Sequence, residues 1–114
     1  MANGRPLSIP VILGTTRKGR MSVHAARFMV EQLEKHRNVL TELIDLSELP
    51  MAIDDAGESI KDTAFADRMA RADALVIVTP EYNHSFPGLL KHALDSCLKE
   101  YIHKAAGIVG VSAG

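Results

Sequence analysis

The sequence is poor in the residues on which several classes of function depend. Its 114 residues include no Trp, one Cys and only 4% aromatic side chains. A single cysteine, Cys97, allows no intramolecular disulfide and excludes a cysteine-rich metal site. The formal net charge is -1 and no run of like charge is present, so we expect no nucleic-acid partner.

Long hydrophobic runs are missing as well. The N-terminal stretch 1–14 has one Arg and only a few consecutive apolar residues, too few for a signal peptide or a membrane span. We therefore expect no membrane partner and a cytoplasmic location. The composition, 46% hydrophobic and 24% charged, is typical of a globular domain. At this length we expect one domain spanning residues 1–114.

Short apolar runs alternate with amphipathic segments along the chain. The predicted order is strand Val11–Leu13, helix Ser22 to about His36 or Arg37, strand Val39–Leu46, helix Ser59 to about Arg71, strand Ala74–Val78, helix Pro87 or Gly88 to about Ile102 and strand Ala105–Val111. This βαβαβαβ order predicts parallel strands with helices on both faces. Ligands bind such sheets at the carboxyl ends of the strands.

The helices are predicted from apolar residues at three- and four-residue spacing. Ser22 and Ser59 are placed as their N-terminal caps. The predicted inward-facing residues are Val23, Ala26, Met29, Val30 and Leu33 in the first helix, Ile60, Ala64 and Met69 in the second, and Leu90, Ala93, Leu94, Cys97, Leu98 and Tyr101 in the third.

The loop Gly14–Ser22 (GTTRKGRMS) connects the first strand to the first helix. Backbone N–H groups and the helix dipole favour an anion at such a place. The loop lacks the glycine pattern of a dinucleotide site and the Gly-Lys-Ser/Thr ending of a P-loop. A monophosphate held by Thr15, Arg17, Ser22 and backbone amides fits better than a pyrophosphate. The alternative is a solvated basic loop whose serine caps the helix.

The loop Thr79–Gly88 (TPEYNHSFPG) follows the third strand and is unusually rich in side chains that make directed contacts. Tyr82 could pack beside a planar ring, and Asn83 offers both a donor and an acceptor. The alternative is a rigid turn in which Tyr82 covers core and Asn83 takes a strained backbone. After the fourth strand, Ser112–Gly114 are small residues that would let a ligand approach closely, or form a plain turn.

Together these loops resemble a known family. GTTRKGRMS is similar to the Gly-Ser-x-Arg-x-x-x-x-Ser/Asn phosphate loop of the NADPH-dependent FMN reductases, which include azoreductases, quinone reductases and chromate reductases. TPEYNHSFPGLLKHALD resembles their Pro-Glu-Tyr-Asn segment followed by Ser-x-Pro-Gly-x-Leu-Lys-x-Ala-Leu/Ile-Asp. The resemblance covers almost the whole chain. It implies a flavodoxin-like three-layer α/β/α sandwich with a parallel sheet of strand order 2-1-3-4.

The resemblance also implies a set of FMN-binding residues. Thr15, where a serine is usual, and Arg17 would bind the phosphate, and Ser112 would begin the third flavin loop. The remaining implied residues are Arg20, Met21 and Ser22 around the phosphate and ribityl chain, and Pro80, Glu81, Tyr82 and Asn83 along the isoalloxazine ring, largely through their backbone. No side chain is assigned a catalytic role, because the flavin carries the chemistry.

The implied function is an FMN-dependent NAD(P)H oxidoreductase that reduces free flavin, a quinone, an azo compound or a metal oxyanion. The alternatives are a flavin-binding electron carrier or sensor without turnover, and an inactive fragment. Family members continue beyond the fourth strand, so we expect this chain to lack a fifth strand and further helices. The family usually forms dimers or tetramers, and a homo-oligomer is therefore expected.

The remaining polar residues suggest no second site. Histidines 24, 36, 84, 92 and 103 show no metal-ligand spacing, so no metal is expected. His84 alone lies beside the implied flavin, where it could contact substrate. Cys97 is predicted to be a small core residue. Asp54 and Asp55 lie in a loop rather than at a strand end, which argues against a phospho-acceptor site.

Overall fold

The computed structural model of the chain describes residues 4–15, 21–49 and 63–112. Within these ranges the strands are β1 Leu7–Ser8, β2 Val11–Leu13, β3 Val39–Leu40, β4 Leu43–Asp45, β5 Ala74–Pro80 and β6 Ala105–Val111. The helices are α1 Ser22–Glu34, α2 Thr63–Arg71 and α3 Gly88–Asp95, with short 3-10 turns η2 Leu46–Glu48 and η4 Lys99–Tyr101. Ser59, Ile60, Asp54 and Asp55 lie outside the described residues.

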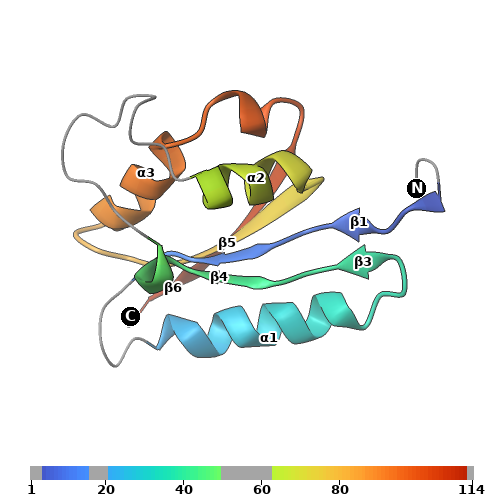
Figure 1. Cartoon of the computed structure of the whole chain (residues 1–114). Helices are drawn as coiled ribbons and strands as arrows, with labels where there is room; N and C mark the ends of the chain where they lie inside the picture. The colour runs from blue at the N-terminus through green and yellow to red at the C-terminus, as the bar shows by residue number, and fades with distance from the viewer. Residues whose placement is uncertain (1–3, 16–20, 50–62, 113–114) are drawn as a thin grey trace.

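The main sheet has four parallel strands in the order β4-β2-β5-β6. These strands correspond to the second, first, third and fourth predicted strands, so the predicted order 2-1-3-4 is confirmed. Ile12 of β2 lies opposite Ile44 on one side and Ile77 on the other. The strands β1 and β3 form a separate parallel pair that extends β2 and β4 (Figure 1).

The second predicted strand is divided into β3 and β4 at Thr41, opposite the residues that separate β1 from β2. The N–H of Ile9 still donates to the carbonyl of Leu40, at 2.8 Å. At this level Thr41 donates from its hydroxyl Oγ1 to the carbonyl of Ile9, at 2.7 Å. The regular ladder resumes where the N–H of Val11 donates to the carbonyl of Glu42.

Helices cover both faces of the sheet, with α1 on one side and α2 and α3 on the other (Figure 1). The side chains of β2 alternate between the two layers. Val11 and Leu13 pack in the cluster with Ala26 of α1. Ile12 joins the larger cluster with Phe65 and Met69 of α2 and with α3. This three-layer arrangement was predicted, and the structure confirms it.

Two predicted inward-facing residues are exposed. In α2 the buried residues are Phe65, Ala66 and Met69, whereas Ala64 is exposed, so its assignment was wrong. The larger Phe65 takes the inward position next to it because it buries more apolar surface. Leu98 was also placed inward, but 80% of its surface is exposed.

The exposure of Leu98 follows from the early end of α3. The helix ends at Asp95, where the hydroxyl of Ser96 donates to the carbonyl of Ala93 at 2.6 Å and competes with the helical ladder. The predicted extension to Ile102 was therefore wrong. Tyr101 nevertheless packs against the core, and its hydroxyl donates to the carbonyl of Leu94 at 2.8 Å. Burial raises the pKa of that phenol.

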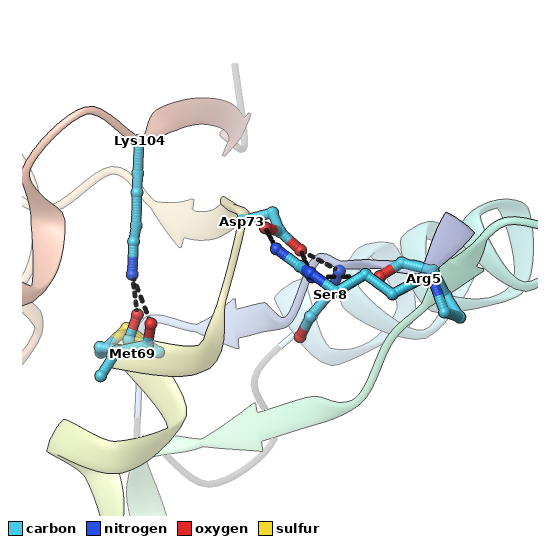
Figure 2. A network of polar contacts seen from close by, with 7 residues as sticks. Arg5, Ser8, Met69, Asp73 and Lys104 are labelled. Carbon is cyan, nitrogen blue, oxygen red and sulfur yellow. Dashed lines mark hydrogen bonds and ion pairs between the residues drawn. The ribbon is translucent and has the colours of Figure 1, made fainter. Parts of the chain in front are cut away.

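The amino ends of β5 and β6 are held by charged side chains (Figure 2). Arg5 donates to both carboxylate oxygens of Asp73, at 2.8 and 2.6 Å, and the N–H of Ser8 donates to the same carboxylate at 2.7 Å. The Arg5 hydrogen bonds, followed by the Ser8 N–H, hold the pKa of Asp73 well below its usual range. Lys104 donates to the carbonyls of Met69 and Ala70, at 2.5 and 2.9 Å, and thereby caps the end of α2.

Candidate functional site

The opposite edge of the sheet, where the strands end, carries the predicted loops. Because the strands are parallel, β2, β5 and β6 finish on the same side. The N–H of Gly14 donates to the carbonyl of Val78 at 2.8 Å, and the N–H of Glu81 donates to the carbonyl of Val111 at 3.1 Å. These two bonds hold the starts of all three loops together.

Gly14 lies at the tightest point of this edge. A methyl group on its Cα would lie 3.0 Å from the carbonyl oxygen of Val78 and 3.0 Å from Cδ2 of Leu90 on α3. Only glycine lets the chain leave β2 at this distance from both neighbours. The close approach sets the position of the next residue, Thr15, which is buried.

Ser22 has a different place from the one predicted. It is the first residue of α1, whose N-cap is Met21, and Met21 makes no side-chain capping bond. Because Ser22 already belongs to the helix, it cannot act as the N-cap, and that prediction was wrong. Its hydroxyl is buried and finds no hydrogen-bond partner among the residues that the structure describes.

An unsatisfied buried hydroxyl at a helix N-terminus requires a physical explanation. Leaving such a group without a partner costs about 1–3 kcal/mol. An anion bound at the N-terminus of α1 would supply the acceptor and would also be favoured by the helix dipole. The donor chemistry of Ser22 therefore fits a phosphate group. Arg17 and Arg20, also predicted to contact this phosphate, lie outside the described residues.

The loop after β5 forms a tight two-residue turn. The N–H of Tyr82 donates to the carbonyl of Ser85 and the N–H of Ser85 donates to that of Tyr82, both at 2.9 Å. Asn83 and His84 have φ angles of 51° and 62°. Two successive positive φ values are what a type I′ turn requires. The expected unusual backbone of Asn83 is present, and that of His84 was missed.

The hydroxyl of Tyr82 lies 2.7 Å from Oγ1 of Thr15 and links the first loop to the second. Tyr82 is half-buried. No sequence pattern pointed to this contact between residues 67 positions apart. The sequence suggested this contact only in that two residues with hydroxyl groups were predicted at the same edge of the sheet.

The loops after β5 and β6 are linked through Glu81. The hydroxyl of Ser112 donates to Oε1 of Glu81 at 3.4 Å, and Nδ1 of His84 lies 3.8 Å from Oε2. His84 is almost fully exposed, at 98% of its side-chain surface. Pro80 closes β5 and is half-buried, whereas Asn83 and Met21 are exposed. The edge therefore combines buried hydroxyls with an exposed polar rim.

The described ranges contain neither a metal site nor a membrane-spanning helix. Residues 4–15, 21–49 and 63–112 contain no group of three or more His, Cys, Asp or Glu arranged to hold a metal ion. Among the helices in those ranges, none has the length and apolar character needed to cross a bilayer. Cys97 is buried in the core, as predicted.

The fold defines a class of protein, a flavodoxin-like α/β domain, here with the buried hydroxyl of Ser22 at the N-terminus of the helix that follows its first central strand. Residues 7–114 match the family model of the NADPH-dependent FMN reductases. The chain belongs to this family, as the resemblance of its two loop motifs predicted.

Curated relatives include two bacterial enzymes. An FMN-dependent NADPH-azoreductase of Staphylococcus haemolyticus is 32% identical over 115 residues, which cover 91% of this chain and 60% of the relative. A quinone reductase of Pseudomonas putida is also 32% identical over 115 residues, covering 94% of this chain and 61% of the relative. The chain thus spans about three-fifths of the length of these relatives.

Solved structures show the same fold. An NADH:FMN oxidoreductase in its apo form superposes with a TM-score of 0.79 at 22% identity, over 95% of this chain and 59% of the other. A flavoenzyme NAD(P)H:(acceptor) oxidoreductase from Paracoccus denitrificans has a TM-score of 0.71 at 28% identity, over 95% and 62% of the two chains.

Proposed function

We propose that this chain forms the flavin-binding part of an FMN-dependent NAD(P)H oxidoreductase. Electrons would pass from NAD(P)H through bound FMN to free flavin, a quinone, an azo compound or a metal oxyanion. The observation that carries the proposal is the buried hydroxyl of Ser22 at the N-terminus of α1, which has no partner among the described residues. Family membership and the names of the relatives support it.

The proposed FMN-binding residues divide between two ends of the cofactor. Thr15, Arg17 and Ser22 hold the phosphate by hydrogen bonds and charge, and Arg20 and Met21 complete that loop. The turn that follows β5 and the start of the β6 loop would hold the ring, through Pro80, Glu81, Tyr82, Asn83 and Ser112. FMN supplies the hydride and electron chemistry when bound, and the protein binds and orients it.

Oligomeric state and location are part of the same proposal. We propose a cytoplasmic homodimer or homotetramer whose complete form continues with a fifth strand beside β6. At present β6 is an edge strand of the described sheet, and Ile108 on it is 73% exposed. An exposed apolar edge strand is a site where another strand pairs. The greater length of the relatives is consistent with this continuation.

The test compares FMN binding by the wild type and the Ser22→Ala variant. FMN fluorescence is titrated with protein, and NADPH oxidation is followed with a quinone acceptor. We expect the wild type to bind FMN and to oxidise NADPH. Ser22→Ala removes one hydrogen bond to a charged group and should weaken FMN binding about tenfold or more. Ser96→Ala serves as the control, because the Ser96 hydroxyl donates to the carbonyl of Ala93 in α3.

The outcomes separate the competing functions. FMN uptake with no NADPH oxidation by any acceptor would favour the electron carrier over the enzyme. A wild-type protein that takes up no FMN would contradict both flavin functions for this chain. Equal FMN affinity in the wild type and the Ser22→Ala variant would remove Ser22 from the phosphate site.

A further inference from the structure

The contact between Thr15 and Tyr82 joins two loops whose implied roles are at opposite ends of the cofactor. Thr15 is buried, at 2% exposure, and was assigned to the phosphate. Tyr82 was assigned to the ring, largely through its backbone. The 2.7 Å distance between their hydroxyl oxygens places the phenol of Tyr82 at the phosphate end instead.

The turn that carries Tyr82 is held in place on both sides. Its two backbone bonds between Tyr82 and Ser85 close the turn, and the N–H of Glu81 is bonded to Val111 at the end of β6. The positive φ values of Asn83 and His84 reverse the chain within two residues. These bonds fix the position of the Tyr82 main chain, from which its side chain reaches Thr15.

A phosphate group determines the direction of the hydrogen bond. A hydroxyl donates one hydrogen and accepts through two lone pairs, whereas a phosphate oxygen only accepts. Thr15 must therefore point its hydrogen at the phosphate to bind it. The hydrogen in the 2.7 Å contact must then come from Tyr82. A chain of hydroxyls running toward an anion also strengthens each of its bonds by polarisation.

We propose that Tyr82 is a positioning residue for the cofactor phosphate: its hydroxyl donates to Oγ1 of Thr15 and thereby turns the Thr15 hydrogen toward the anion. This inference rests on the proposed function, since it assumes that FMN binds at this edge. It predicts that the Tyr82 hydroxyl contributes to binding of FMN and contributes nothing to binding of riboflavin, which has the same ring and no phosphate.

The experiment is a double-mutant cycle on flavin affinity. Dissociation constants for FMN and for riboflavin are measured by fluorescence with the wild type, Tyr82→Phe, Thr15→Val and the double variant. Tyr101→Phe is the matched control, because it makes the same change at a phenol that donates to the carbonyl of Leu94. Circular dichroism checks that each variant is folded.

We expect Tyr82→Phe to weaken FMN binding about three- to tenfold, the range for one neutral hydrogen bond. Riboflavin affinity should change less than about twofold, within the scatter of distant substitutions. In the Thr15→Val background the Tyr82→Phe change should have no further effect, because its acceptor is gone. Thr15→Ser should keep the dependence on Tyr82, since serine restores the hydroxyl.

Three results would overturn the inference while leaving the proposed function intact. These are equal losses for FMN and riboflavin, losses that add in the double variant, and FMN affinity unaffected by Tyr82→Phe. A wild-type chain that binds neither flavin would overturn the inference and the proposed function together.

Discussion

The two edges of the same sheet are built in opposite ways. At the amino edge, charged groups are matched to partners: Arg5 and the Ser8 N–H to Asp73, and Lys104 to the last carbonyls of α2. At the carboxyl edge, the hydroxyl of Ser22 is buried with no acceptor within the described ranges.

Backbone conformation does not separate the two edges. Asn83 and His84 after β5 have positive φ, and so does His103, beside Lys104 at the amino edge. The difference lies in the polar groups, and proteins keep unsatisfied groups where a ligand will use them. The contrast supports the proposal that the carboxyl edge binds a ligand, whereas the amino edge serves stability.

The largest change should come from Gly14→Ala. The added methyl group would meet the carbonyl oxygen of Val78, which cannot move without disturbing the sheet. We expect a loss of about 1–3 kcal/mol in the free energy of unfolding, as for overpacking in a core. Urea denaturation measures it. Gly110→Ala is the control, because a methyl group there meets nothing within 4 Å; equal losses in both variants would contradict the close-approach explanation.

In the protein without ligand, Ser22→Ala should change the free energy of unfolding less than Gly14→Ala does, and should increase it. Removing the unpaired hydroxyl should raise stability by about 1 kcal/mol, because a buried polar group no longer lacks a partner. Differential scanning fluorimetry of the apo protein would then show a melting temperature higher by a few degrees. The carboxyl edge would thereby gain stability from a change that, on the proposed function, weakens FMN binding. A lower melting temperature in the apo variant would show that Ser22 has a structural partner.

The smallest effect should come from Asp73→Asn at the amino edge, because the ion pair is exposed to solvent. The folded protein lowers the pKa of Asp73, so its ionised form adds stability above the unfolded pKa of about 3.9. That stability is lost as the pH falls through the folded pKa. The wild type should therefore exceed the variant in stability at pH 7, and the difference should shrink on acidification below about pH 4.

Urea denaturation at several pH values measures that difference. Asp67→Asn, which alters an exposed carboxylate on α2, is the matched control. A gap between the wild type and Asp73→Asn that stays constant from pH 7 to the acid range would show that charge plays no part in this contact.

The sheet could be predicted because its evidence is local. Each central strand is a short apolar run bounded by polar loops, and the alternation with helices determines parallel pairing. The residues Val11–Leu13 and Ala74–Val78 were placed correctly on this basis, and the family motifs then gave the strand order. Helix ends were harder, because at Ser96 a single side-chain bond stops α3 well before the apolar pattern does.

The placement of the candidate site residues at the sheet edge could be predicted, whereas their contacts could not. The motifs placed Thr15, Ser22 and Tyr82 at one sheet edge, and the structure does the same. The sequence does not show whether Ser22 lies inside α1 or just before it, because the two placements of the helix start differ by one residue. The contact between Thr15 and Tyr82 depends on the backbone conformation of the turn that follows β5, and residue types alone do not determine that conformation.

The close approach at Gly14 also limits how this domain can diversify. A binding site normally acquires new specificity by changing the size of the residues that line it. At Gly14 there is no spare volume, because backbone from β5 and a side chain from α3 already lie at contact distance. Larger side chains are therefore excluded at Gly14. If this edge binds a ligand as proposed, changes of specificity are easier at exposed positions such as Asn83 and His84, provided that the new residues tolerate the positive φ values of the turn.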